Sequence, residues 1–275
     1  LRTQVSKLDG TRKFLFRLAD GNAIESVFMR YKFGNSICVS SQAGCRMGCR
    51  FCASTIGGLK RNLTPGEIAG QILAAQRETG QRISHVVVMG TGEPFDNYEN
   101  LAKFLHIIHD PNGLNLSMRN ITVSTCGLVP MIARFAEDFP QVNLAISLHA
   151  VSNEMRDEIM PVNKAYPMET LLSACRDYTQ KTARRVTFEY TLVKGVNDSA
   201  EYARKLAARL QGMLCHVNLI PLNKVEETGY DTSERCAVLR FQQVLTECGI
   251  PATIRRELGD DIDAACGQLR LAENG

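Results

Sequence analysis

The sequence lacks any run of eighteen apolar residues, and this absence excludes a transmembrane helix. It also lacks a recognisable signal peptide, low-complexity segments and repeats other than an alternation of strands and helices. The formal net charge is only +3, which neither requires nor excludes a nucleic-acid partner. The chain begins at Leu1 instead of Met, and we therefore expect an N-terminal part to be missing.

What is present fits a folded enzyme with metal or redox chemistry. A chain of 275 residues with 44% apolar content is long enough for one α/β barrel or two smaller domains. Its ten cysteines, in a chain of this length without an export signal, indicate a reducing compartment. We therefore expect a cytoplasmic protein, monomeric and with no membrane association.

The hydrophobic pattern predicts an α/β fold. An N-terminal β-hairpin is expected at 13–18 and 24–31, and we assign residues 1–34 to this extension and 35–275 to the core with a C-terminal extension. Six β-rich runs then alternate with helical patterns, which predicts a parallel sheet covered by helices. Composition leaves open whether this sheet is open or partly closed. Polar residues at the strand ends favour a partial (βα)6 TIM-type barrel. The strands are expected at 36–41, 85–89, 121–124, 143–149, 185–193 and 216–222, with a last one at 252–257, and the helices at 64–76, 97–109, 129–137, 168–181, 200–211 and 233–248.

Three cysteines, Cys45, Cys49 and Cys52, follow the first of these strands in a C-x3-C-x2-C spacing. Thiolates are soft ligands that favour iron–sulfur clusters, zinc or Cu(I). A structural zinc site or an ordinary cubane cluster needs four protein ligands, whereas three thiolates leave one iron open to a substrate. A zinc site completed by another residue such as Cys38, or three buried thiols, remains the alternative.

This spacing resembles the radical S-adenosylmethionine (radical SAM) superfamily, in which C-x3-C-x2-C binds a [4Fe–4S] cluster, and the aromatic Phe51 before Cys52 fits that pattern. Residues 89–94 (Met-Gly-Thr-Gly-Glu-Pro) are similar to the "GGEP" motif that recognises the amino group of SAM in that superfamily. Longer stretches resemble the RlmN/Cfr family of radical SAM adenine methyltransferases. These stretches are 38–45, 45–52, 61–64, 89–94, 145–150, 219–223 and 259–269.

The resemblance implies a reaction that uses two SAM molecules and forms a covalent RNA–protein intermediate. Cys266 would be the methylated cysteine and Cys38 the resolving cysteine, whose attack on Cys266 leaves a disulfide bond. Glu25 would be the proton acceptor, although an acid in such a strand is normally solvent-facing. Cys45, Cys49 and Cys52 would hold the cluster, and the SAM contacts would be Gly92, Glu93, Ser124, Ser147, Leu148, His149 and Asn223.

The resemblance also implies the partners. These are 23S rRNA and tRNA as substrates and an electron-donor protein such as flavodoxin. The adenine must be presented outside a stack. The family carries an accessory N-terminal helical domain, and we expect this domain to be absent from the chain.

Three alternatives remain open. Methylation at adenine C8, as in Cfr-type resistance enzymes, competes with C2, and Pro221 in the 219–223 run favours C2, as does the loop 45–49. A different radical SAM enzyme such as a peptide maturase would have extra cysteines clustered near the C-terminus, whereas Cys236, Cys248 and Cys266 are widely spaced. A zinc or redox cysteine protein would bind no SAM.

Overall fold

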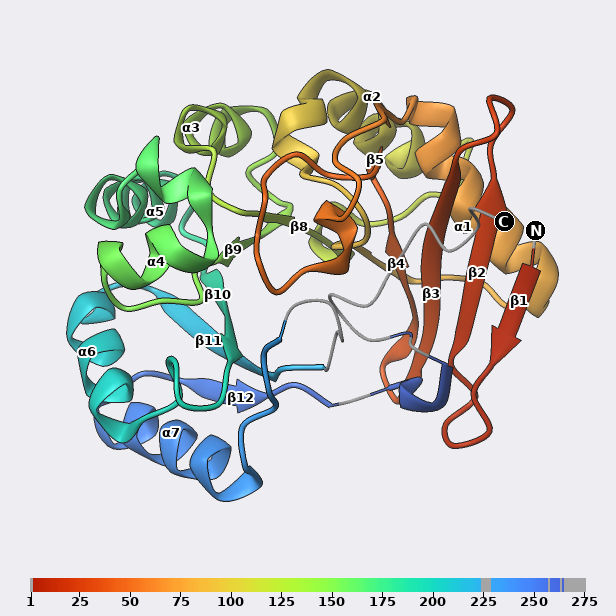
Figure 1. Ribbon diagram of the computed structural model, residues 1–275. Coiled ribbons are helices and arrows are strands. Elements are labelled where there is room, and N and C mark those ends of the chain that lie inside the picture. The colour runs from red at the N-terminus through yellow and green to blue at the C-terminus, as the bar shows by residue number, and fades with distance from the viewer. Residues whose placement is uncertain (1, 224–228, 257, 263, 265–275) are drawn as a thin grey trace. The chain divides into compact units, whose positions relative to one another are not determined.

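The computed structural model describes residues 2–223, 229–256, 258–262 and 264 (Figure 1). The chain divides into two units by its internal contacts. Unit 1 comprises residues 1–46, 52–124 and 257–275, and unit 2 comprises residues 47–51 and 125–256. No helix in the described part of the chain is long and apolar enough to cross a membrane.

Unit 1 is built on a mixed sheet with the strand order β1-β2-β3-β4-β7-β8. The first four strands pair antiparallel, whereas β4, β7 and β8 pair parallel. The elements are β1 (Arg2–Val5), β2 (Arg12–Arg17), β3 (Ala23–Tyr31), β4 (Gly34–Val39), β7 (His85–Val88), β8 (Ile121–Thr125), a short ladder of β5 (Gln42–Ala43) with β6 (Arg61–Asn62), the helices α1 (Pro65–Thr79) and α2 (Tyr98–His109), and the 3-10 turns Ala53–Thr55, Pro94–Asn97, Met118–Asn120 and Asp260–Ile262.

Local sequence explains where α1 begins and ends. The Thr64 hydroxyl accepts from the Glu67 N–H at 3.2 Å, and the Glu67 carboxylate accepts from the Thr64 N–H at 2.9 Å. This reciprocal capping box, followed by Pro65 at the first helical position, satisfies backbone donors that the helix itself leaves unpaired. Gly80 ends the helix in the left-handed region, at φ 64°.

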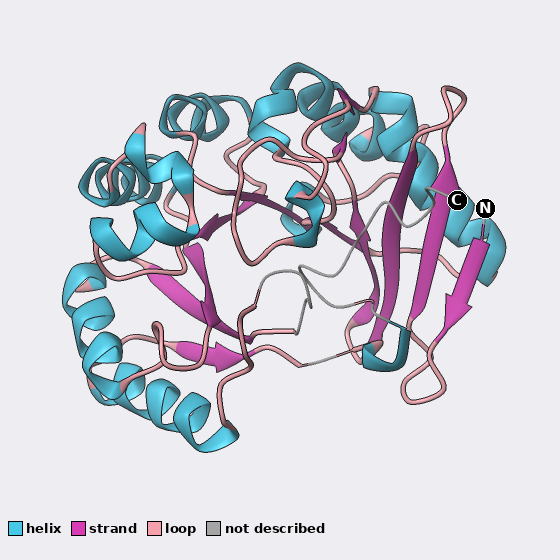
Figure 2. Cartoon of the chain, in the orientation of Figure 1, coloured by secondary structure: helices cyan, strands magenta, loops and turns pink. Residues whose placement is uncertain are grey.

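Unit 2 contains a parallel sheet in the order β9-β10-β11-β12. On β10, Phe188 and Tyr190 are fully buried, and the Tyr190 ring lies 5.1 Å from that of Phe241 on α7. The helices therefore cover this face, and Glu189 points to the opposite face. The elements are α3 (Val129–Asp138), β9 (Asn143–Ser147), α4 (Asn153–Ile159), the 3-10 turn Pro161–Lys164, α5 (Met168–Thr182), β10 (Val186–Leu192), α6 (Ala200–Leu210), β11 (Cys215–Pro221), α7 (Arg235–Glu247) and β12 (Ala252–Ile254) (Figure 2).

The predicted α/β alternation is confirmed. The hairpin is present as β2 and β3, and each of the six predicted helices and seven predicted core strands is present within a few residues of its expected bounds. The sequence did not predict β1, the β5–β6 ladder or α4. These are short elements, and short elements show too few periods to be recognised from sequence.

Candidate active site

The loop that carries Cys45, Cys49 and Cys52 is closed at its base. Strands β5 and β6 pair there, and the Lys60 N–H donates to the carbonyl at the end of β5 at 2.8 Å. Gly44 follows with a φ of 76°, and a Cβ atom at this position would lie 2.0 Å from the carbonyl oxygen of Gly58. The two arms of the loop approach so closely that only glycine fits at position 44.

The three cysteines differ in exposure. Cys45 is buried, whereas Cys49 and Cys52 are partly exposed. No disulfide joins two cysteines of the described residues, and no three His, Cys, Asp or Glu side chains among those residues are grouped as a metal site. The donor set nevertheless fits an iron–sulfur cluster, because three thiols within eight residues supply soft ligands. Cys45, Cys49 and Cys52 are the residues that would hold it.

Within unit 2, the segment 47–51 of this loop rests on α4 and on the turn that follows β9. The Arg50 N–H donates to the Ile159 carbonyl at 3.0 Å, and a Cβ on Gly48 would lie 3.6 Å from Pro161. The Phe51 ring makes an edge contact with the His149 ring, with 4.9 Å between centroids. The backbone around Cys49 is therefore fixed on both sides.

In unit 1, the end of β4 is bonded to the turn after β7. The backbone N–H groups of Ser41 and Gln42 both donate to the Thr91 carbonyl, at 2.9 and 3.1 Å. The Ser40 hydroxyl accepts from the Thr91 N–H at 2.9 Å and donates to the Glu25 carbonyl at 2.6 Å. These bonds hold the predicted SAM-binding turn against the start of the cysteine loop.

Gly90 and Gly92 allow this turn to pack closely against the end of β4. A Cβ on Gly92, whose φ is 108°, would lie 2.6 Å from the Gln42 side chain, and a Cβ on Gly90 would lie 2.7 Å from the Ser40 hydroxyl. The close approach that these glycines permit is thus to the protein's own backbone and side chains. Glu93 is buried, and its carboxylate accepts from the Phe95 N–H at 3.0 Å.

In unit 2, the end of β9 and the turn after it carry three predicted SAM contacts. The N–H groups of Leu148 and His149 both donate to the Glu189 carbonyl, at 3.0 and 3.3 Å. His149 then adopts a φ of 55°, which turns the chain sharply. Ser147, the residue before this turn, is partly buried.

The His149 ring is buried, and its Nδ1 accepts from the Thr191 N–H at 2.9 Å. Burial lowers the pKa of His149 to about 3, and the nearby Arg156 guanidinium adds to the shift. The neutral ring therefore carries its proton on Nε2 and can donate a hydrogen bond to a ligand, but it cannot act as a base while Nδ1 is bonded.

Three polar side chains, Ser147, Glu189 and Asn218, lie side by side on neighbouring strands of unit 2, because their positions are paired in the sheet register. Asn218 donates to the Glu189 carboxylate at 2.7 Å, and burial raises the pKa of that carboxyl. The sequence analysis did not select Glu189. An acid in the middle of an apolar strand was the signal that could have identified it.

The other predicted SAM contacts lie at strand ends, as expected. Ser124 is partly buried in β8 of unit 1. Asn223 is partly buried and follows β11 in unit 2, where the neighbouring Leu222 N–H donates to the Leu192 carbonyl at 3.3 Å.

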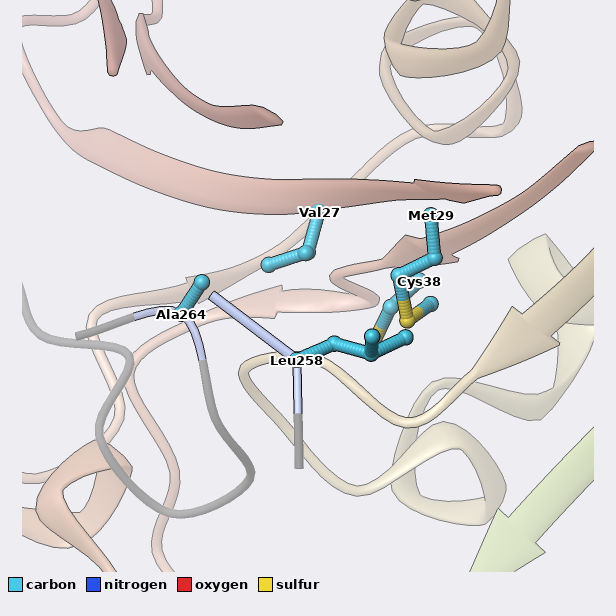
Figure 3. Close-up of a cluster of buried hydrophobic side chains, with 5 residues drawn as sticks. All are labelled: Val27, Met29, Cys38, Leu258 and Ala264. Atoms are coloured by element: carbon cyan, nitrogen blue, oxygen red, sulfur yellow. The ribbon is translucent and has the colours of Figure 1, made fainter. Parts of the chain in front are cut away.

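Cys38 lies in a small apolar cluster within unit 1 (Figure 3). It is 5% exposed and packs with Val27 and Met29 of β3, and with Leu258 and Ala264 from the C-terminal part of the chain. Cys266, the predicted methylated cysteine, lies outside the described residues. Ala264, which precedes Cys266 by two positions in the sequence, packs in the same cluster as Cys38.

Glu25 is buried, so the expectation of a solvent-facing acid is wrong. Only 3% of the residue is exposed, and its carboxylate lies 3.1 Å from the Lys13 ammonium, which is also nearly buried. Lys13 is on the neighbouring strand, two positions from the direct register partner of Glu25, and its charge offsets the cost of burying the carboxylate.

Comparisons with known proteins identify the family of this chain. Residues 39–207 match the family described as the Radical SAM superfamily. The chain is 57% identical over 270 residues to a protein of Clostridium novyi named "Probable dual-specificity RNA methyltransferase RlmN", covering 98% of this chain and 79% of that one. A protein of the same name from Geobacillus kaustophilus is 56% identical, covering 98% of this chain and 74% of that one.

Solved structures show the same similarity. A radical SAM methyltransferase from Sphaerobacter thermophilus superposes with a TM-score of 0.95 at 50% identity, covering 98% of this chain and 80% of that one. This match confirms the predicted radical SAM fold. Streptococcus suis SuiB bound to S-adenosylmethionine matches at TM-score 0.60 and 12% identity, over 82% of this chain and 55% of that one, which shows a shared fold alone.

Proposed function

Because the chain belongs to the radical SAM superfamily, and within it to the RlmN-type RNA methyltransferases, we propose that it methylates C2 of an adenosine in 23S rRNA and in tRNA. The observation that carries this proposal is the 57% identity over nearly the whole chain to a relative named as a dual-specificity RNA methyltransferase. This similarity argues against the alternative of a zinc or redox protein without enzymatic activity.

Cys266 and Cys38 have complementary roles in the proposal. Cys266 accepts a methyl group from one SAM, and the methyl carbon loses a hydrogen atom to the 5′-deoxyadenosyl radical and forms a bond to C2 of adenine. The resulting adduct gives one proton to Glu25 and one electron, which the oxidised cluster would take up, and it remains tethered to Cys266 through a thioether. The Cys38 thiolate then attacks the Cys266 sulfur and breaks the sulfur–carbon bond, which leaves a disulfide for a reductant to open. The freed carbon takes up a proton, and the methylated RNA is released. The packing of Ala264 beside Cys38 supports this pairing.

Glu25 accepts the proton in this scheme. Its carboxylate is buried beside Lys13, and the Ser40 hydroxyl donates to its backbone carbonyl at 2.6 Å. Ser40 also accepts from the turn at Thr91, so the strand position of Glu25 is tied to the predicted SAM-binding turn.

Two SAM molecules are consumed per turnover in the proposal, one as methyl donor and one as radical source. When bound, the [4Fe–4S] cluster on Cys45, Cys49 and Cys52 supplies the electron that cleaves SAM to a 5′-deoxyadenosyl radical. We assign SAM binding to the seven residues predicted for it from the sequence, which are Gly92, Glu93, Ser124, Ser147, Leu148, His149 and Asn223. An electron-donor protein such as flavodoxin, a monomeric state and a cytoplasmic location complete the proposal.

Nucleoside mass spectrometry tests the function. The full-length protein, reconstituted with iron and sulfide, is incubated anaerobically with SAM, a reductant and protein-free rRNA or tRNA. 2-Methyladenosine is the expected product. 8-Methyladenosine would instead assign the chain to the resistance branch of the family, and an intact cluster with no methylated base would contradict the proposal.

A further inference from the structure

Arg156 is an unusual residue of unit 2 that the proposed chemistry does not use. It is fully buried in α4. Its Nη2 donates to the carbonyls of Cys126 and Ser147 at 2.6 and 3.1 Å, and its Nε donates to the Leu148 carbonyl at 3.2 Å. Nη1 donates to the Asn163 side chain at 3.2 Å. The guanidinium therefore ties the ends of two neighbouring loops together at the turn that carries Ser147 and Leu148.

Among the residues that the structure describes, Arg156 donates to carbonyls and to an amide and forms no ion pair with a carboxylate. Asp157 is linked to it through Asn163, whose amide donates to Asp157 at 2.8 Å. Burying a cation without an anion is costly, and carbonyl dipoles compensate only in part. A negative charge placed near this guanidinium would therefore be stabilised.

The predicted cluster loop is the place from which that charge would come. The turn of α4 that begins at Arg156 supports this loop, because the Met160 N–H donates to the Arg156 carbonyl at 2.7 Å and Ile159 accepts from Arg50, next to Cys49. Burial lowers the pKa of Arg156, and the thiols of Cys126 and then of Cys49 raise it when they are ionised. Three thiolates around a cluster bring net negative charge, which grows by one unit when the cluster accepts an electron.

On the basis of the function proposed above, we propose that Arg156 is a positioning residue for this reaction, with two separable roles. Its planar, fork-shaped guanidinium group donates to the carbonyls of Ser147 and Leu148 and so aligns the SAM-binding turn after β9. Its positive charge stabilises the reduced form of the cluster bound at Cys49, so that a one-electron donor of low potential reduces it more easily.

Two substitutions separate these roles. Arg156→Lys keeps the charge but loses the fork, and Arg156→Met keeps much of the length but loses both. We expect Arg156→Lys to bind SAM about tenfold or more weakly, as substitutions behind a ligand shell commonly do, with a cluster midpoint potential close to that of the wild type. Arg156→Met is expected to bind SAM weakly and to show a lower midpoint potential. The readouts are equilibrium binding of SAM and a redox titration followed by electron paramagnetic resonance.

Arg184→Met is the matched control. Arg184 belongs to the same unit, is only partly buried and donates to Asn143 at the opposite end of β9, so its loss should change neither readout. Wild-type SAM affinity in Arg156→Lys would overturn the role of the fork. A wild-type potential in Arg156→Met would overturn the role of the charge. Failure of the wild-type protein itself to take up iron or SAM would instead contradict the proposed function.

If Arg156→Met does not fold, a charge-conserving swap tests the electrostatic role by itself. Asp157→Asn combined with Asn163→Asp moves one carboxylate from an indirect to a direct partner of Arg156 without changing net charge or side-chain shape. Neutralisation by the new carboxylate should lower the midpoint potential. An unchanged potential in this double variant would refute the electrostatic role.

Discussion

At the scale of single residues, His149 shows how burial decides what a titratable group can do. From the residue alone, a histidine beside a strand end carries no assignable chemistry, and only the family resemblance made it a SAM contact. The structure gives the physical basis for a donor role. Its Nδ1 accepts from the Thr191 N–H, burial keeps the ring neutral, and Nε2 retains the proton.

This burial predicts a stability change with pH. The pKa of His149 is lowered from 6.5 to about 3 in the folded state, so the unfolded chain binds the proton more readily. The contribution to stability is therefore complete above pH 6.5 and is lost as pH falls below it. Between pH 7 and pH 5 the loss is about 2 kcal/mol. His149→Asn should remove this part of the pH dependence in urea unfolding.

Asparagine suits the test because its side-chain oxygen can accept from Thr191 and because it tolerates the left-handed backbone at this position. Other buried groups, such as Glu189, titrate in both proteins and cancel in the comparison. An equal pH dependence in wild type and His149→Asn would show that the ring is protonated without cost in the folded state.

A second prediction at this scale concerns Cys38. Cys38→Ala removes the proposed resolving thiol, so covalent protein–RNA adduct should accumulate and be visible as a slowly migrating band that ribonuclease removes. Cys175→Ala is the control, because Cys175 is a fully buried thiol whose pKa burial raises to about 12. Release of free methylated RNA at the normal rate by Cys38→Ala would disprove the resolving role.

At the scale of elements, the base of the cysteine loop depends on glycine. Gly44→Ala would place a methyl group 2.0 Å from the Gly58 carbonyl and would also strain the backbone at φ 76°. Gly57→Ala is the matched control, since its φ is 85° but its Cβ would meet nothing within 4 Å. Backbone strain alone costs about 1–2 kcal/mol. We expect the iron content after reconstitution to fall severely in Gly44→Ala and only slightly in Gly57→Ala.

Equal iron content in the two variants would mean that the loop base can open without loss of the cluster. The sequence showed that Gly44 precedes Cys45, but not that it faces Gly58, because the contact joins residues fourteen positions apart through a loop without periodicity. Similarly, the sequence did not show that Gly90 and Gly92 approach Ser40 and Gln42.

Helix α4 was not predicted from the sequence, and this omission had the largest consequence for the description of the site. It has only seven residues, yet Ser152 caps it by accepting from the Met155 N–H at 3.3 Å. The cap was readable in the sequence. The full burial of Arg156 was not, because a charged residue in a short polar segment normally faces solvent. In contrast, α1 was predictable because a capping box and apolar spacing agree.

At the scale of the whole molecule, unit 1 is assembled from distant parts of the chain. The Gly259 N–H donates to the Asp9 carboxylate at 3.0 Å, and the Lys7 N–H donates to Asp261 at 2.9 Å. Leu258 then packs beside Cys38. Sequence patterns could not predict this arrangement, since periodicity reports local structure and not which distant segments meet.

This packing predicts the reactivity of Cys38. Leu258→Ala removes buried apolar contact worth about 2 kcal/mol, so the segment at Leu258 should separate from Cys38 about 30-fold more often. The alkylation rate of Cys38 by iodoacetamide, followed by peptide mass spectrometry, should rise by a similar factor. Leu239→Ala, at a residue that is 48% exposed, is the control, and the exposed Cys236 serves as an internal standard. An unchanged Cys38 rate in Leu258→Ala would show that Leu258 does not shield the thiol.

The bond between Asp9 and Gly259 also sets an order of events during synthesis. The two residues are 250 positions apart, and at 5–20 residues per second the ribosome needs roughly 12–50 s to make the chain between them. During that time, β3 and β4 have been made, but the residues that cover Val27, Met29 and Cys38 have not. In the nascent chain, the Cys38 thiol and its apolar surroundings are therefore accessible to chaperones and oxidants until translation reaches Leu258.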